Sequence, residues 1–373
     1  MSPVEYRLAS IVLRVFARLF GLLPLDRRKV VLATARVPEL DGNLARIDAA
    51  LRSRHPDLRY VHLLEPYGYG LVAKVAYLGR LVRGMYHLQT ARLFVVDNAY
   101  LPIHVAPHRP GTTVVQVWHA VAALKRFGAD TVAPLAEPER TFLHRNYDVV
   151  IAASEAARAP YSAALRTPLE RVLPLGAPRT DFFFDEGALQ AARARVLAAY
   201  PALAGRRVVL YAPTFRGRGP GKRAAPHLDG RRLRDALPAD HLLVAKMHPN
   251  LNDPGAPTAG FDLVVDPRYE LNDLFTVTDV LVTDYSSSIF EFALLHRPLV
   301  LLVPDLAEYE RDPGLYLDFR REMIGAQVAD TAGVIAAVSA GVVDRAAYDS
   351  FIARHLGAAD GRASERFVEH FLG

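Results

Sequence analysis

Eleven short apolar runs, each followed by a polar or helical segment, most strongly limit how this chain can fold. They are rich in β-branched residues and predict strands at 29–35, 59–64, 92–97, 112–118, 148–154, 171–176, 206–214, 241–249, 262–266, 279–284 and 298–304. Strands that are apolar along their whole length are typical of parallel sheets covered by helices on both faces. The pattern therefore predicts an α/β fold built on parallel sheets.

The number of strands and one long helix indicate two domains. Eleven strands are too many for one comfortable doubly wound sheet, and the helical pattern at 186–200 separates the first six from the last five. A length of 373 residues also favours two domains over one. We predict two Rossmann-like parallel-sheet domains, 1–180 and 181–373, facing each other across a cleft. The final helical stretch, 344–371, could pack on either domain, including back on the first.

Composition excludes some classes of chemistry and leaves others open. The chain has no cysteine, which excludes disulfides, thiolate metal sites and cysteine nucleophiles. Its net charge of +5 suits nucleic acid, anionic lipid or phosphorylated substrates and does not choose among them. Since the basic residues are scattered and no recognition motif accompanies them, we expect no nucleic-acid partner. Dinucleotide, P-loop, G-x-S-x-G and H-E-x-x-H fingerprints are absent, so no metal or cofactor is predicted.

The N-terminal segment 8–23 is mostly apolar but is interrupted by arginines. Arg14 and Arg18 lie inside it and Arg7 directly precedes it, which argues against a membrane-spanning helix. No small-residue cleavage site follows, so we do not expect a signal peptide. Two interpretations stay open: an amphipathic helix lying on an anionic membrane, and a core helix of the first domain. We expect a cytoplasmic protein that is at most peripheral to the membrane.

Four strand ends carry polar groups suited to phosphate or acid–base chemistry. Ligands of open α/β sheets bind outside the carboxyl ends of strands, so these residues should border the cleft. The segment WHAVAALKRFG (118–128) places His119 at one such end, followed by Lys125. A lone histidine is more often structural, but His119 could accept a proton from an attacking hydroxyl near neutral pH. In KMHP (246–249), Lys246 and His248 should share one face of a strand, which suits a phosphate or a developing oxyanion.

The other two strand ends are YAPTFR (211–216) and VTDYSSSIFEF (282–292). The polar residues they supply are Thr214, Arg216, Asp284, Ser286, Ser287, Ser288 and Glu291. Arg216 suits bidentate phosphate binding or, alternatively, a surface ion pair. The serines precede a helix, whose free N–H groups form a ready anion site. We assign Ser288 mainly to the helix cap, where Glu291 could complete a capping box, which leaves two hydroxyls for a ligand.

Taken together, these segments resemble the CDP-glycerol glycerophosphotransferase family of teichoic-acid synthesis. Five family motifs occur in the family's order within roughly 29–325, matched by WHAVAALKRFG, GAPRTD (176–181), YAPTFR, KMHP and TDYSSSIFE. One match alone would be weak, but five in order are specific. The chain departs from the family at Ala120 and Val121, which stand where the family has Gly-Thr after the histidine.

The resemblance implies a GT-B fold and an enzyme at the cytoplasmic face of the cell membrane. The reaction implied is transfer of glycerol phosphate, or a related polyol phosphate such as ribitol phosphate, from a CDP-activated donor to a hydroxyl of an undecaprenyl-type lipid-linked acceptor, releasing CMP. It implies that His119 is the base on that hydroxyl and that His248 supports the phosphate. The donor-binding residues implied are Thr214, Arg216, Lys246, Asp284, Ser286, Ser287 and Glu291. Lys125, Arg179 and Asp181 are possible cleft residues, although Asp181 could instead hold Arg179.

Two other functions fit parts of the same evidence. A GT-B glycosyltransferase using a nucleotide sugar for capsule or cell-wall polysaccharide would share the fold but attack carbon rather than phosphorus. A non-catalytic, membrane-associated binding protein would explain Ala120 and Val121 as marks of a decayed site.

Overall fold

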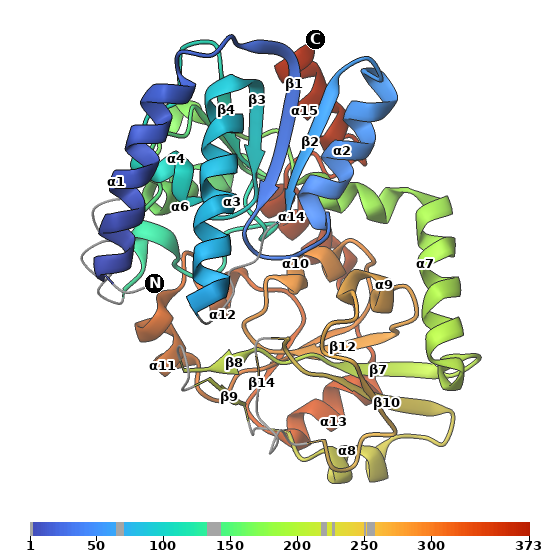
Figure 1. The fold of residues 1–373 in the computed structure, drawn as a ribbon. Helices are drawn as coiled ribbons and strands as arrows, with labels where there is room; N and C mark the ends of the chain where they lie inside the picture. Colours follow the sequence, from blue (N-terminus) through green and yellow to red (C-terminus); the bar gives the residue numbers. More distant parts are fainter. Residues whose placement is uncertain are drawn as a thin grey trace. The chain divides into compact units, whose positions relative to one another are not determined.

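The computed structural model describes residues 3–64, 71–132, 143–217, 222–225, 228–249, 251 and 258–373, without the side chains of 71–74. The chain divides into two compact units. Unit 1 comprises Met1–Asp181 with Arg354–Gly373, and unit 2 comprises Phe182–Ala353. The elements of each unit are labelled in Figure 1.

Unit 1 contains a parallel sheet of six strands in the order β2-β1-β3-β4-β5-β6. The strands are β1 (Asp26–Thr34), β2 (Arg59–Leu64), β3 (Ala91–Val96), β4 (Thr113–Gln116), β5 (Val149–Ile151) and β6 (Val172–Leu173). The helices are α1 (Pro3–Phe20), α2 (Gly42–Arg54), α3 (Leu71–Thr90), α4 (Leu101–Val105), α6 (Glu155–Leu165) and α15 (Ala363–Leu372). Short 3-10 helices are η1 (Gly128–Asp130), η2 (Leu169–Arg171) and η3 (Pro178–Phe184), the last of which runs into unit 2.

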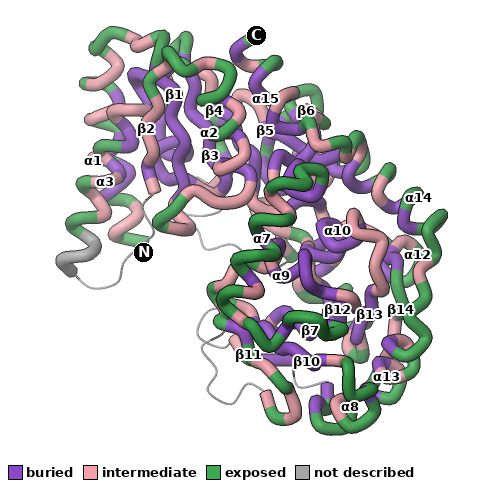
Figure 2. The backbone as a smooth tube through the Cα atoms, turned by 90° about the vertical axis from the view of Figure 1, so that its right-hand side faces the viewer, coloured by how far each residue is buried: buried purple, intermediate pink, exposed green. Residues whose placement is uncertain are grey.

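Alternate residues of the unit 1 strands enter two separate cores. Val31 and Ala33 of β1 belong to a cluster with α1, α3, α4 and α6, whereas Val30 and Leu32 pack with α2 and α15. Because side chains alternate between the faces of a strand, a sheet covered on both faces needs apolar residues at every strand position. This explains the continuous apolar runs in the sequence, and Figure 2 shows most of these strands as buried.

Unit 2 contains a second parallel sheet, in the order β11-β10-β7-β12-β13-β14. Its strands are β7 (Arg207–Tyr211), β10 (His241–Lys246), β11 (Leu263–Val265), β12 (Val280–Thr283), β13 (Leu299–Leu302) and β14 (Ala326–Val328), and β8 (Phe215–Arg216) pairs antiparallel with β9 (Arg223–Ala224). The helices are α7 (Glu186–Ala199), α8 (Gly230–Ala236), α9 (Leu271–Phe275), α10 (Ser288–Ala293), α11 (Leu306–Tyr309), α12 (Phe319–Glu322), α13 (Thr331–Ala340) and α14 (Arg345–Leu356), with η4 (Pro201–Leu203) and η6 (Glu310–Gly314). Helices α8 and α13 share a core with the sheet.

Each sheet has one point at which the strand order reverses. In unit 1, β1 lies between β2 and β3, and in unit 2, β7 lies between β10 and β12. At such a switch point the connections leave toward opposite faces, so a crevice opens at the carboxyl ends of the two central strands. The chain that follows β1 and β3 in unit 1, and β7 and β12 in unit 2, is therefore where each unit should bind ligands.

The structure confirms all eleven predicted strands and the two Rossmann-like parallel sheets. The sequence pattern missed β14 and the short pair β8 and β9. Strand β14 is only the three residues AQV at a sheet edge, with none of them buried, so it lacks an apolar run. The last helix, α15, packs in unit 1, where Phe367 and Val368 join the core that contains Leu44 and Ile47 of α2.

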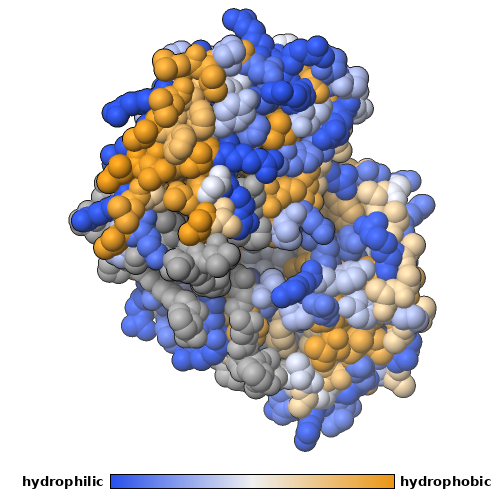
Figure 3. All heavy atoms as spheres, in the orientation of Figure 1, coloured by the Kyte–Doolittle hydropathy of each residue, from blue (hydrophilic) through white to orange (hydrophobic). Residues whose placement is uncertain are grey.

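Helix α1 packs on unit 1 through one face, as the core-helix interpretation expects, and exposes an apolar stripe on the other. One face packs into unit 1 through Ala9, Leu13 and Ala17, which are buried. The opposite side carries Val4, Leu8, Ile11, Val15 and Leu19, whose exposed fractions lie between 49% and 67%. Figure 3 shows hydrophobic side chains gathered over this helix. Within the described residues, no helix has both the length and the apolar character needed to cross a membrane.

Candidate functional site

A buried carboxylate joins the two central strands at the switch point of unit 2. Asp284, directly after β12, accepts hydrogen bonds from the backbone N and the Oγ1 of Thr214 at 2.9 and 3.0 Å. Thr214 follows β7, which neighbours β12. Nη1 of Arg216 donates to Asp284 Oδ2 at 2.8 Å. Three predicted residues from two separate segments therefore form one hydrogen-bonded cluster.

Arg216 is neutralised by carboxylates within this cluster. Its Nε donates to Asp305 Oδ2 at 2.7 Å, and its side chain is only 12% exposed. The guanidinium carbon lies 5.0 Å from the ring centroids of both Tyr285 and Tyr309. Burial, then the hydrogen bond to Asp305, raises the pKa of Tyr285, so its hydroxyl stays protonated and donates to Asp305 Oδ1 at 2.9 Å. Arg216 thus makes ion pairs, the alternative to phosphate binding that its sequence context left open.

The turn between β12 and α10 leaves two serines only partly buried. Within 282–292, only Ser286 and Ser287 are not classed as buried. Ser286 Oγ accepts the N–H of Ser288 at 3.2 Å and lies 2.7 Å from Ser288 Oγ. Ser287 precedes the helix and makes no capping hydrogen bond through its side chain. The capping bond therefore falls to Ser286, and Ser288, which the sequence assigned to the cap, is the first residue of the helix itself.

A second polar group lies at the ends of β10 and α9. Lys246 Nζ donates to the carbonyl of Pro267 at 2.9 Å, and burial lowers its pKa against the opposing effect of Glu270. Glu270 accepts the N–H of Asn272 at 3.2 Å, and Asn272 Nδ2 donates to Glu291 Oε1 at 2.8 Å. These contacts give Lys246 and Glu291 partners other than the Arg216 cluster.

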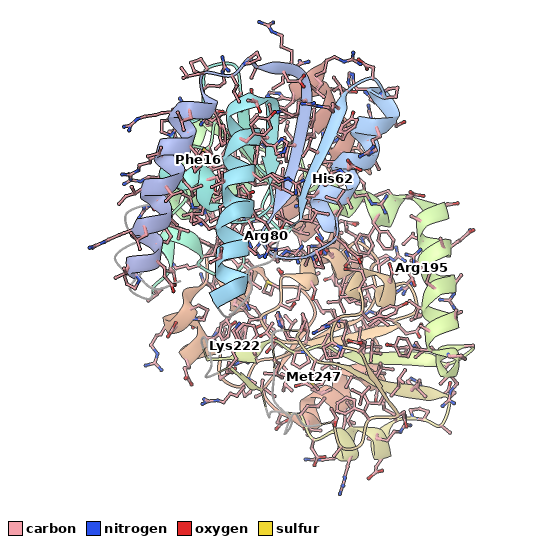
Figure 4. All side chains as sticks on the ribbon, in the orientation of Figure 1. Phe16, His62, Arg80, Arg195, Lys222 and Met247 are labelled. Carbon is pink, nitrogen blue, oxygen red and sulfur yellow. The ribbon has the colours of Figure 1, made fainter. Side chains whose placement is uncertain are left out.

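His248 lies beside Phe215, the residue that precedes Arg216 in the chain. Its half-buried ring meets the edge of Phe215 with centroids 4.8 Å apart and planes at 82°. The ammonium of Lys222, labelled in Figure 4, lies 4.6 Å from the centroid of the Phe215 ring. Sequence reasoning did not single out Lys222, although it lies within a Gly- and Arg-rich segment, 216–232, that directly follows a strand end. Unit 2 therefore brings an imidazole and a cation to one aromatic ring.

His119 lies at the end of the β4 segment in unit 1. Its Nδ1 is 3.3 Å from the backbone carbonyl oxygen of Asp97. A carbonyl oxygen only accepts, so Nδ1 carries the proton and Nε2 keeps its lone pair. Burial, followed by the charge of Arg36, lowers the pKa of His119 to about 4; Arg179 adds to this effect and the Asp97 carbonyl opposes it. The ring is therefore neutral near pH 7 and presents a basic nitrogen.

A buried polar network holds the turn that carries His119. Trp118, directly before it, adopts a φ of 50°, which is uncommon for a large side chain, and its N–H donates to Gln116 Oε1 at 2.8 Å. Gln116 Nε2 donates to the Tyr147 hydroxyl at 3.0 Å. The same hydroxyl lies 3.0 Å from His104 Nε2 and 3.1 Å from His144 Nδ1. The network thus links the strained backbone to the interior of unit 1.

Arg179 contacts the backbone of the same turn. Its Nη1 donates to the carbonyl of His119 at 3.1 Å, and its N–H donates to Asn43 Oδ1 at 2.9 Å. Asn43 Nδ2 in turn donates to the carbonyls of Val117 and Trp118 at 3.1 and 2.8 Å. Arg179 therefore holds the backbone of the turn that carries His119.

The other possible cleft residues differ in their surroundings. The buried Asp181 accepts the N–H groups of Ala363 and Ser364 at 3.0 and 2.8 Å, so it caps the start of α15. A carboxylate is favoured at a helix N-terminus because N–H groups there have no partner inside the helix. Lys125 is half-buried on the segment that follows His119.

Sequence reasoning missed three charged residues at the switch point of unit 1. Arg36 follows β1 and Asp97 follows β3, and Nη2 of Arg36 lies 3.6 Å from Oδ2 of Asp97. The same nitrogen also pairs with Asp41. The signal that identified the other strand ends, a polar residue at or just after the end of a buried strand, was present at both Arg36 and Asp97. In the described part of the chain, no group of three or more histidine, aspartate or glutamate side chains is arranged to hold a metal ion.

The chain is similar to known proteins over nearly its whole length. The model of the family described as CDP-Glycerol:Poly(glycerophosphate) glycerophosphotransferase matches residues 15–373. The teichoic acid ribitol-phosphate primase of Bacillus spizizenii is 34% identical over 95% of this chain and 94% of its own length. The teichoic acid poly(ribitol-phosphate) polymerase of the same organism is 33% identical over 95% of this chain and 57% of its own length. The solved wall teichoic acid polymerase TagF superposes with a TM-score of 0.72 at 20% identity, covering 100% of this chain and 97% of that one, and so shares the GT-B fold.

Proposed function

This chain belongs to the CDP-glycerol:poly(glycerophosphate) glycerophosphotransferase family and is a transferase of substituted phosphate groups; we propose that its donor is a CDP-polyol and its acceptor a lipid-linked hydroxyl in teichoic-acid synthesis. The observation that carries this proposal is the family match, which spans both units. Both relatives described above are named for ribitol phosphate, so CDP-ribitol is the first donor to test and CDP-glycerol the second.

The reaction is a displacement at phosphorus. The acceptor oxygen bonds to the phosphorus that bears the polyol, the bond from that phosphorus to the bridging oxygen breaks, and CMP leaves with the bonding electrons. In-line phosphoryl transfer needs alignment, a base and positive charge, and no covalent enzyme intermediate. In this proposal the acceptor proton passes to Nε2 of His119, whose lone pair the Asp97 carbonyl keeps free.

The donor is proposed to bind in unit 2. Ser286 and Ser287 are the part of their stretch that is not fully buried, and they would donate hydroxyl hydrogen bonds to the diphosphate. His248 would support the transferred phosphate, with Lys222 adding positive charge. The remaining donor-side residues fit best as supports, because their side chains bond to one another or to neighbouring elements. These are Thr214, Arg216, Lys246, Asp284 and Glu291.

Because the proposed acceptor is a lipid, the enzyme must work at a membrane surface. We propose that α1 lies on the cytoplasmic face of an anionic membrane. Its exposed apolar positions recur every three or four residues, so they form one stripe along the helix. Arg7, Arg14 and Arg18 are exposed along the border of this stripe. An apolar stripe with flanking cations suits an interfacial helix rather than a spanning one.

A donor screen tests the proposed function. Purified protein would be incubated with lipid extracts and, in turn, with CDP-ribitol, CDP-glycerol and UDP-sugars, and released CMP, CDP and UDP would be measured. We expect CMP release with a CDP-polyol, and His119→Ala should slow it by about 10²- to 10⁴-fold while leaving donor affinity unchanged. UDP release with a sugar donor and no CMP would favour the glycosyltransferase alternative. Donor binding without any turnover would favour a non-catalytic binding protein.

A further inference from the structure

Two buried polar atoms lack partners at the switch point of unit 1. Within the described residues, Oδ1 of Asp97 and Nε of Arg36 are buried and have no hydrogen-bond partner. Their side chains are nevertheless neighbours, because Arg36 Nη2 lies 3.6 Å from Asp97 Oδ2. Buried polar groups are nearly always hydrogen-bonded. An unpaired acceptor beside an unpaired donor therefore indicates a site where a ligand could bond to both atoms.

The position of this pair connects it to the proposed base. Asp97 directly follows β3 and Arg36 follows β1, the two strands that flank the switch point of the sheet. The backbone carbonyl of Asp97 is the acceptor for His119 Nδ1. This contact, and the effect of the Arg36 charge on His119, place the pair beside the imidazole, so we expect a group bound by the pair to lie near the proposed base.

The charges of the pair select the class of ligand. A phosphate would be repelled by the Asp97 carboxylate, and a cation would be repelled by the Arg36 guanidinium. A hydroxyl is neutral and fits both atoms, because it donates one hydrogen bond and accepts another. Burial raises the pKa of Asp97, with Arg36 and the Thr34 hydroxyl opposing, and a donated hydroxyl would further stabilise the ionised carboxylate.

We propose that Asp97 and Arg36 bind a second hydroxyl of the acceptor's polyol, adjacent to the hydroxyl that attacks. This inference rests on the proposed function and adds a specificity site for a vicinal diol. The side chain of Arg36 is 31% exposed, and its ion pair with Asp97 is longer than its pair with Asp41. In this proposal the longer contact gives way to admit the hydroxyl between Arg36 and Asp97.

A pair of synthetic acceptors isolates the contact. One is a short-chain lipid ending in glycerol phosphate, and the other ends in propane-1,3-diol phosphate and lacks only the secondary hydroxyl. With the donor at saturation, we expect the wild-type enzyme to favour the first acceptor by about 10- to 100-fold in kcat/KM. Asp97→Asn and Arg36→Gln should each shrink this preference to within about 3-fold, mainly by raising KM for the hydroxylated acceptor.

Asp57→Asn is the matched control, since Asp57 is an exposed carboxylate of unit 1 on the connection that enters β2. It should keep the wild-type preference. A preference unchanged in both Asp97→Asn and Arg36→Gln, with turnover intact, would overturn the inference and leave the proposed function standing. Thermal unfolding and donor affinity would verify that each variant is folded, and Arg36→Gln serves alone if Asp97→Asn does not fold. CMP release with neither acceptor in the wild type would contradict the proposed function itself.

Discussion

Nδ1 of His119 lies 3.3 Å from the carbonyl oxygen of Asp97, and this contact leaves Nε2 as the basic atom of the ring. Because burial and Arg36 lower the pKa of His119 to about 4, the ring stays neutral down to about pH 5. If His119 is the base, activity is lost only when its ring is protonated. We therefore expect kcat/KM for CMP release to stay constant as the pH is lowered to 6 and to fall only near the pKa of His119.

Arg36→Gln should move the acid limb of the pH profile of kcat/KM to higher pH, because removing a positive charge raises the pKa of His119. The shift should stop short of an ordinary histidine, since burial is the larger cause. Arg28→Gln, which removes an exposed arginine paired with Asp57, should leave the profile where it is. An acid limb near pH 6.5 in the wild type would show that another group is the titrating base.

Tyr147→Phe should reduce both stability and turnover. Its hydroxyl contacts His104, His144 and Gln116, all buried, so its loss leaves polar atoms unpaired at a cost of about 1–3 kcal/mol. Gln116 also holds the strained Trp118, so kcat should fall as the His119 turn loosens. Tyr60→Phe removes a hydroxyl bonded to Leu51 and His55 and should lower the melting temperature without changing kcat. Equal kcat values for Tyr147→Phe and Tyr60→Phe would show that the hydrogen-bond network around Tyr147 does not contribute to catalysis.

Ser286 and Ser287 should respond differently to alanine. Ser286 caps the N–H of Ser288, so Ser286→Ala should cost about 1 kcal/mol of stability as well as donor affinity. Ser287 makes no capping bond, so Ser287→Ala should raise the Kd for CDP-ribitol by about 5- to 20-fold with an unchanged melting temperature. Calorimetric titration and thermal unfolding separate the two effects. Unchanged affinity in both variants would contradict a diphosphate site at these hydroxyls.

Arg216→Ala should destabilise unit 2 strongly. It leaves the buried carboxylate of Asp284 and the partly buried carboxylate of Asp305 without their cation, and losing one partner of a buried ion pair typically costs about 3–5 kcal/mol. Arg195→Ala is the control, because Arg195, labelled in Figure 4, pairs with Asp273 on the surface with 58% of its side chain exposed. That pair should contribute at most about 1 kcal/mol. Urea unfolding measures both, and equal costs would show that the Arg216 pairs are not buried as described.

Leu8→Ser with Val15→Ser should weaken binding to vesicles that contain anionic lipid without unfolding unit 1, because both side chains are exposed. Deleting the helix would be a poorer test, since Leu13 is fully buried in the core. The control is Val264→Ser, at an exposed apolar position of unit 2. Vesicle co-sedimentation at low and high salt checks the result, and binding equal to that of the wild type would argue that the stripe has another role.

Much of the candidate site could be predicted because many of its residues lie within three positions of the ends of buried strands. Thr214, Asp284 and His119 were found by this rule, and it also applied to Arg36 and Asp97, which were overlooked. The rule predicts where a residue lies in the sheet but not which groups its side chain contacts. Arg216 was therefore compatible with a phosphate or an ion pair until the structure placed Asp284 and Asp305 beside it. Similarly, Asp181 was predicted as a possible cleft residue or a partner of Arg179, and its hydrogen-bond partners on α15, which are 182 and 183 residues away, were not predicted.

The sequence by itself determined the eleven longer or more apolar strands, the two sheets and the family, because a strand buried on both faces needs an unbroken apolar run and the motifs occur in order. Only the tertiary structure decided which polar groups meet. The bonds of Asp284 to Thr214 and Arg216 span 70 and 68 residues, and they exist because β7 and β12 are neighbours in the sheet. Local periodicity does not encode strand order, so those pairings, and the unpaired atoms of Asp97 and Arg36, became visible only in the folded chain.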